Sequence, residues 1–156
     1  MPTSSTMAKL SVGDQAPEFT LKTEKGEPVT LAGSLAKGPV VLIFYPMDNT
    51  PGCTAQLCSA RNDAPRYAEA GISVYGVNNG GAASHQRFSE KHNLQAPLLV
   101  DDSLKVAAAY DAVISLGLVR FINRTVVGVA RDGTIAFYKR GTPSTDEILA
   151  AFTANV

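Results

Sequence analysis

The stretch PVVLIFYPMDNTPGCTAQLC, residues 39–58, decides the fold that the sequence predicts. Its first half is a continuous apolar run rich in β-branched and aromatic residues, which is typical of a strand buried on both faces of a sheet. Pro46 cannot continue the hydrogen-bond ladder, so we expect the strand to end there. After Pro51 the apolar spacing becomes helical, which places Cys53 at the start of a helix, just beyond the carboxyl end of the strand. Open α/β sheets usually carry their chemistry at this edge.

The following segments alternate between strand and helix patterns. Pro65 is expected to kink or divide the helix that begins near Pro51, and Gly71 is expected to end it. The next predicted elements are a buried strand at 72–77, a helix at 85–93 with Ser84 as its N-cap, a short strand at 96–102 and a short helix at 104–110. Such alternation predicts an α/β domain.

Hairpin patterns flank this alternating region. Apolar and polar residues alternate on both sides of a Lys-Gly turn in residues 16–31, and two β-rich runs meet across an Asp-Gly turn in residues 124–140. The last segment opens with Ser144 and Glu147 at the spacing of a capping box, which predicts a C-terminal helix. Together the patterns predict a mixed central sheet that is covered by helices on both faces.

Length and charge restrict the possible functions. The chain has 156 residues, and its 14 lysines and arginines balance 14 aspartates and glutamates, which argues against nucleic acid or an anionic membrane as the main partner. Residues 1–10 are polar and lack the apolar core of a secretory signal, so we expect a disordered tail, a single domain at 11–156 and a cytoplasmic location. Two cysteines in such a chain favour redox or metal chemistry over a disulfide framework.

The residues around Cys53 suit a reactive thiol. Only the thiolate is nucleophilic, and the unpaired N–H groups at a helix N-terminus stabilise that anion. Thr50 offers a hydroxyl next to the thiol, and Pro46 offers an apolar wall without a hydrogen-bond donor. The alternative is that Thr50 only caps the helix and that Cys53 is a small buried hydrophobic residue. The complete string is far less common than any of its parts, and it favours the reactive thiol.

Pro46, Thr50 and Cys53 form the pattern P-x-x-x-T-x-x-C, and FYPMDNTPGCTAQLC resembles the active-site segment of peroxiredoxins. The closest match is the subgroup called bacterioferritin comigratory protein, or peroxiredoxin Q. The resemblance extends from about residue 13 to residue 152. It includes GDQAPEFTL, SHQRFSEKHNL with PLLVDD, and the Arg-Thr pair that begins at Arg124.

The resemblance implies a thioredoxin-like fold and a thiol peroxidase that needs no cofactor and no metal. Cys53 would be the peroxidatic cysteine, which becomes a sulfenic acid, while Thr50 and Arg124 would bind the peroxide oxygens and Pro46 would shield the site. Arg124 also fits on chemical grounds, because a fixed guanidinium stabilises a thiolate and the charge on a departing oxygen. The alternatives are that Arg124 makes only a salt bridge at a strand end, or that Arg120 fills this role.

The second cysteine, Cys58, lies five residues after Cys53. On one regular helix their Cα atoms would lie roughly 9 Å apart, beyond the limit of about 7 Å for a disulfide. Either the two never bond, or the first turns of the helix unwind when Cys53 is oxidised. The resemblance implies the second case, with Cys58 as the resolving cysteine that forms an intramolecular disulfide. The alternative is that Cys58 packs in the core and an external thiol resolves Cys53.

The expected partners also follow from the resemblance. They are hydrogen peroxide, organic hydroperoxides, and thioredoxin or a similar dithiol, with the chain acting as a monomer that binds neither nucleic acid nor membrane. A non-catalytic alternative is a peroxide sensor or holdase that uses the same thiols. A disulfide oxidoreductase would need a C-x-x-C spacing that the sequence lacks.

The segment AVISLGLVRFI, residues 112–122, is unusually apolar for a connection. We consider three interpretations of it: a border of the active site that favours organic or lipid hydroperoxides, a contact surface, or a buried helix.

Overall fold

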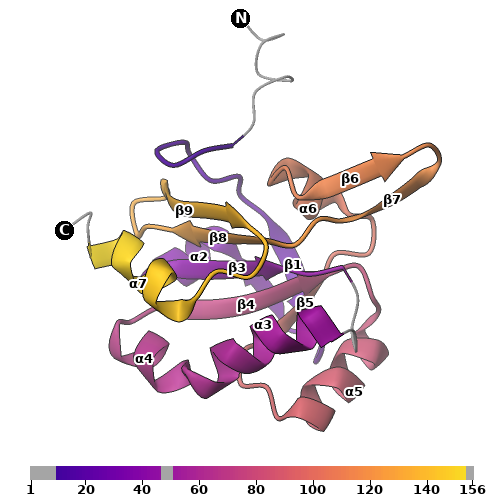
Figure 1. Cartoon of the computed structure of the whole chain (residues 1–156), viewed down its shortest axis with the longest axis horizontal. Helices are drawn as coiled ribbons and strands as arrows, with labels where there is room; N and C mark the ends of the chain where they lie inside the picture. The colour runs from indigo at the N-terminus through magenta and orange to yellow at the C-terminus, as the bar shows by residue number, and fades with distance from the viewer. Residues whose placement is uncertain (1–9, 47–50, 154–156) are drawn as a thin grey trace, which may run out of the picture.

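The computed structural model describes residues 10–46 and 51–153, with the backbone alone at 51–55. The tail expected at 1–10 therefore lies almost wholly outside the described residues. Seven strands form one sheet in the order β2-β1-β5-β4-β3-β8-β9, and two further strands form a separate hairpin (Figure 1). The strands are β1 (Thr20–Thr23), β2 (Pro28–Thr30), β3 (Val40–Phe44), β4 (Ser73–Asn78), β5 (Leu98–Val100), β6 (Val113–Leu116), β7 (Val119–Ile122), β8 (Thr125–Val129) and β9 (Ile135–Arg140).

The sheet is mixed, as predicted. Strand β3 runs parallel to β4 and antiparallel to β8, and β1 joins the sheet by antiparallel pairing with β5. The helices are α2 (Leu31–Leu35), α3 (Pro51–Asn62), α4 (Ala64–Glu69), α5 (Ala82–His92), α6 (Lys105–Ala109) and α7 (Thr145–Thr153). Among the helices that the structure describes, none combines the length and the apolar composition that a bilayer crossing needs.

The central position of strand β3 in the sheet explains why its sequence is apolar at every position. Val40, Leu42 and Phe44 pack in the core on one face of the sheet, together with residues of α2 and α6. Val41 and Ile43 pack on the other face, together with residues of α3, α4, α5 and α7. Side chains of a strand alternate between faces, so a central strand covered on both sides needs an uninterrupted apolar run. This confirms the predicted buried strand and the two covered faces.

Several local predictions are confirmed by hydrogen bonds. At the start of α7, the backbone N–H of Glu147 donates to Ser144 Oγ at 3.1 Å, and the N–H of Ser144 donates to Glu147 Oε1 at 3.2 Å. This is the expected capping box. The predicted division of the long helix also occurs, since α3 ends before Asp63 and Pro65 lies in the first turn of α4. Gly71 follows α4 with a φ of +74°, which glycine adopts without strain.

One prediction was wrong, and one of the three interpretations of the segment 112–122 is excluded. Helix α5 begins at Ala82 with Gly81 as its N-cap, so Ser84 lies inside the helix and does not cap it. Gly81 has φ −76° and ψ 168°, and this extended conformation lets the chain enter the helix earlier. The apolar segment 112–122 is not a buried helix. It forms the β6–β7 hairpin, with Gly117 at φ +62° in the turn.

Candidate active site

The candidate site lies where β3 ends and α3 begins. β3 ends at Phe44, and α3 begins at Pro51, so Cys53 belongs to the first turn of the helix, as predicted. Thr50 and the side chain of Cys53 lie outside the described residues. The described residues nevertheless show how the chain leaves β3 and what surrounds it there.

A buried asparagine holds the end of β3. Asn78, which is 2% exposed, donates from Nδ2 to the backbone carbonyl of Tyr45 at 2.7 Å. Its Oδ1 accepts from the backbone N–H of Gly80 at 2.7 Å. A buried amide with both ends bonded is stable where it lies and costly to displace. Asn78 therefore fixes the backbone immediately before Pro46 against the end of β4. This role of Asn78 was not predicted from the sequence, although an asparagine at the end of a buried strand is a usable signal.

Pro46 and Arg124 border the same pocket, although 78 positions separate them in the chain. The pocket has a volume of about 300 Å³. Arg124 is half-buried, and its backbone carbonyl accepts from the N–H of Gly141 at 2.9 Å. Arg120, the alternative candidate, is an exposed residue of β7 and does not line the pocket. The lining residues are Pro46, Ile114, Phe121, Ile122, Asn123, Arg124 and Gly141.

The β6–β7 hairpin supplies the apolar side of this pocket. Ile114 of β6 and Phe121 of β7 are register partners, and both line it. The hairpin projects from the main sheet at the upper right of Figure 1. Leu118 at its turn is fully exposed, at 103%, while Phe121 is 36% exposed. Ile114, Phe121 and Ile122 of the apolar segment thus border this pocket, and the interpretation of the segment as a border of the active site stays a prediction.

A polar network begins at Thr125, the residue that follows Arg124 in the chain. Arg140 donates to Thr125 Oγ1 at 2.9 Å and lies 3.6 Å from the carboxylate of Asp111. The hydroxyl of Tyr138 donates to the backbone carbonyls of Tyr110 and Asp111 at 2.8 and 3.0 Å. Burial raises the pKa of Tyr138, so its hydroxyl keeps the proton that it donates. The network ties the strand that follows Arg124 to the start of the hairpin, and no local sequence pattern predicted it.

Both cysteines belong to α3. The side chain of Cys58 is half-buried and a free thiol. Gln56, two residues earlier, is 7% exposed and donates a long hydrogen bond of 3.4 Å from Nε2 to the carbonyl of Pro143. Because residues 51–62 form one continuous helix, the Cα atoms of Cys53 and Cys58 lie roughly 9 Å apart by helix geometry. A disulfide between them requires the helix to change locally.

Within the described residues, no group of three or more His, Cys, Asp and Glu side chains is placed to hold a metal ion. His85 is fully buried at 0% exposure, and its Nε2 lies 3.2 Å from the carbonyl of Leu99. Its ring is 6.4 Å from the ring of Tyr45. The buried His85 ring thus packs close to Tyr45, the residue that follows β3.

Comparisons of the sequence with known proteins all lead to one family. Residues 12–138 match the family model described as AhpC/TSA family. The chain is 46% identical over 98 residues to the chloroplastic peroxiredoxin Q of Triticum aestivum, covering 63% of this chain and 45% of the relative. It is 42% identical over 102 residues to peroxiredoxin Bcp of Bacillus subtilis (strain 168), covering 65% of this chain and 64% of the relative. The chain spans about half the length of the curated relatives that it matches.

Comparisons of the structure agree. Peroxidoxin BcpB from Mycobacterium tuberculosis superposes with a TM-score of 0.87 at 31% identity, covering 93% of this chain and 97% of the other. A structure of the bacterioferritin comigratory protein of Xanthomonas campestris, described for its alkyl peroxide reduction activity, superposes with a TM-score of 0.82 at 26% identity. This alignment covers 94% of this chain and 97% of the other.

Proposed function

Because the chain belongs to the AhpC/TSA family, in its peroxiredoxin Q and Bcp group, we propose that it is a thiol peroxidase acting on hydrogen peroxide and organic hydroperoxides. Its fold is the thioredoxin-like peroxiredoxin fold that the sequence predicted. The observation that carries the proposal is the convergence of Pro46 and Arg124 on one pocket, because Pro46 lies on the connection between β3 and the helix whose first turn contains Cys53.

Cys53 is the proposed peroxidatic residue. Its thiolate sulfur attacks the outer oxygen of the hydroperoxide, the O–O bond breaks, and the departing alkoxide or hydroxide takes up a proton. The products are a sulfenic acid on Cys53 and an alcohol or water. The sulfur supplies both electrons, so this step requires neither a metal nor an organic cofactor. The first turn of α3 favours the thiolate, because N–H groups there have no partners within the helix.

The residues around the thiol have separate proposed roles. Arg124 binds the peroxide and stabilises the negative charge that develops on the departing oxygen. Thr50 accepts a hydrogen bond from the protonated peroxide oxygen or donates one to the thiolate. Pro46 closes the site with an apolar surface and limits the access of water. Support for Arg124 and Pro46 comes from their shared pocket.

Cys58 is the proposed resolving residue. Its thiol sulfur attacks the sulfenic sulfur of Cys53, a disulfide forms, and the hydroxyl leaves as water with the thiol proton. Because α3 holds the two residues apart, its first turns must unwind before this step. Thioredoxin or a similar dithiol then reduces the disulfide by exchange. A cytoplasmic location would supply such a donor, and the scheme works within a monomer because one helix provides both sulfurs.

Turnover distinguishes the roles of the two cysteines. With thioredoxin, thioredoxin reductase and peroxide, we expect sustained NADPH consumption by the unaltered chain and only background consumption by Cys53→Ser. Cys58→Ser is expected to be oxidised once and then to stop, because no second sulfur can form the disulfide. Ser59→Ala, next to Cys58 on the same helix, is the matched control and should keep the full rate.

Two results would contradict this scheme. Full activity of Cys58→Ser would exclude an intramolecular disulfide as the route of resolution. If the unaltered chain is oxidised only once, without sustained NADPH consumption, the protein is a peroxide sensor or a holdase and not an enzyme.

The arginine assignment is tested with a pair of variants. Arg124→Lys keeps the charge but loses the planar fork of donors, so we expect kcat/KM for hydrogen peroxide to fall about 100-fold. Arg120→Lys, which changes an exposed arginine of the same segment, should stay within about twofold. The reaction is followed as loss of the free thiol under single-turnover conditions. Equal effects of the two substitutions on kcat/KM would contradict the assignment of Arg124 to the peroxide site.

The apolar wall of the pocket predicts a preference for organic substrates. Phe121→Ala removes a large apolar side chain from the wall, so we expect kcat/KM for cumene hydroperoxide to fall about tenfold. The value for hydrogen peroxide, which has no apolar part, should not change. Leu118→Ala at the exposed turn of the hairpin is the control and should affect neither substrate. A strong preference of the unaltered chain for hydrogen peroxide would count against the apolar wall as a substrate site.

A further inference from the structure

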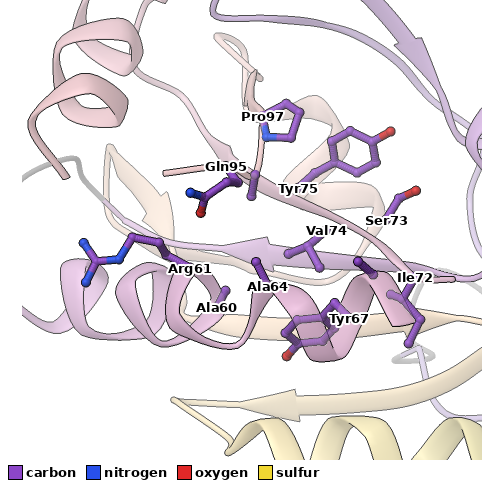
Figure 2. Close-up of a pocket in the computed structure, with 12 residues that line it drawn as sticks. Ala60, Arg61, Ala64, Tyr67, Ile72, Ser73, Val74, Tyr75, Gln95 and Pro97 are labelled. Atoms are coloured by element: carbon purple, nitrogen blue, oxygen red, sulfur yellow. The ribbon is translucent and has the colours of Figure 1, made fainter. Parts of the chain in front are cut away.

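A second cavity lies between α3–α4 and strand β4, and it shares no lining residue with the pocket of Pro46 and Arg124 (Figure 2). Its volume is about 330 Å³, at the lower end of the range of roughly 300–1,000 Å³ for small-molecule sites. One side of this cleft comes from the C-terminal part of α3 and from α4. The other side comes from residues 72–75, mostly β4, and from the segment 95–97.

The walls of the cleft are mostly apolar. Ala60 and Ala64 face Val74 across it, and the small alanine side chains leave the space open. Tyr67, which is 3% exposed, contributes to the same wall, and burial raises the pKa of its hydroxyl. Ile72 closes the end of the cleft opposite Arg61 in Figure 2. An apolar body of modest size therefore fits between the helices and the sheet.

Arg61 and Gln95 lie at the other end of the cleft (Figure 2). The Arg61 guanidinium donates from Nη1 to the carbonyl of His92 at 2.7 Å, and from Nε and Nη2 to Asn62 Oδ1 at 3.1 and 3.0 Å. These bonds hold the guanidinium in place, but both acceptors are neutral. A guanidinium has five N–H groups, so two remain for a further acceptor.

Within the described ranges, Arg61 makes no ion pair, because no carboxylate there lies within ion-pair distance of it. Two carboxylates on flanking segments are already engaged: Asp63 accepts from Thr145 Oγ1 at 2.5 Å, and Glu24 accepts from the N–H of Leu98 at 3.0 Å. A fixed, half-buried cation at the end of an apolar cleft complements a ligand with an apolar body and an anionic head.

We propose that this cleft binds a small amphipathic carboxylate, with its apolar part between Ala64 and Val74 and its carboxylate on Arg61. The Gln95 amide, at the same end, offers two further N–H donors to the anion. An aromatic carboxylate suits the cleft best, because a flat ring fills a narrow space at a small entropic cost.

The ligand would also act on the redox cycle, and this second part rests on the proposed function. In a regular helix the N–H of Arg61 bonds the carbonyl of Leu57, and that of Asn62 bonds the carbonyl of Cys58. Unwinding through Cys58 therefore loosens the turn that carries Arg61. A ligand that requires Arg61 in place stabilises the helical form of α3. It should slow disulfide formation without touching the pocket of Pro46 and Arg124.

The binding site is tested with 2-naphthoate as the probe, by calorimetric titration and by backbone amide shifts of the full chain. We expect saturable binding of one equivalent, with shifts at Ala64 and Val74. Arg61→Gln and the neutral analogue 2-naphthamide should each weaken binding at least about tenfold, the cost of one lost charge-assisted contact. Arg87→Gln, which removes an exposed cation of α5 outside the cleft, is the control and should bind as the unaltered chain does.

A cleft-filling variant, Ala64→Leu, should abolish binding while its circular dichroism stays unchanged. If that variant does not fold, Arg61→Gln alone decides the outcome. The proposal is overturned if 2-naphthoate shows no saturable binding at millimolar concentration, or if Arg61→Gln binds it as tightly as the unaltered chain.

The effect on the redox cycle is measured separately, by mass spectrometry after quenching at short times. Saturating 2-naphthoate is expected to slow disulfide formation at least about threefold and to leave the oxidation of Cys53 by one equivalent of peroxide unchanged. Binding without such slowing would overturn the link to α3 and leave the site standing. Binding to a chain that peroxide does not oxidise would overturn the proposed function and the link together.

Discussion

The continuity of α3 from Pro51 to Asn62 is the constraint on which the rest of the account depends. One helix gives Cys53 the N-terminal position that favours a thiolate, and the same helix keeps Cys58 about 9 Å away. In the proposed scheme the two demands oppose each other, because reactivity toward peroxide would need an intact first turn and disulfide formation would need that turn to open. In the proposed mechanism, oxidation of Cys53 is therefore coupled to local unwinding.

Hydrogen bonds on either side of the β3–α3 connection hold the strand that precedes it and contact the helix that follows it. The buried strand β3 delivers the chain to Pro46, and Asn78 fixes the last backbone group before it. Within α3, Gln56 is tied to Pro143 by a single long hydrogen bond of 3.4 Å. A contact of that length contributes little on its own, so this hydrogen bond adds little to the cost of unwinding the turn. The rigid end of β3 and the first turns of α3, which are proposed to unwind, thus lie next to each other along the chain.

The features that local chemistry determines could be predicted from the sequence. The run in β3 and the box of Ser144 and Glu147 were correct because neighbouring residues specify a strand period or a cap. The start of α5 was predicted wrongly because Gly81 and Ser84 are both acceptable N-caps, and tertiary context chose between them. The hairpin in residues 113–122 was missed because an apolar run does not by itself distinguish a strand from a helix.

The candidate site likewise has one part that could be predicted from the sequence and one part that could not. The cysteine motif is contiguous in the chain and could be recognised there. The network that joins Arg140 to Asp111 and Thr125 links residues 15 to 29 positions apart. No local pattern reveals such pairs, since they depend on how β8 and β9 pack against the start of the hairpin. The cleft beside Arg61 is likewise a product of packing between α3–α4 and β4.

Amide hydrogen exchange of α3, measured before and after one equivalent of peroxide, tests the central claim most directly. We expect the oxidised chain to be 2 Da lighter, from the loss of two thiol hydrogens, and the amides of residues 54–58, which the helix can protect, to lose their protection while those of β3 keep theirs. A disulfide that forms with α3 still fully protected would contradict the coupling of oxidation to unwinding.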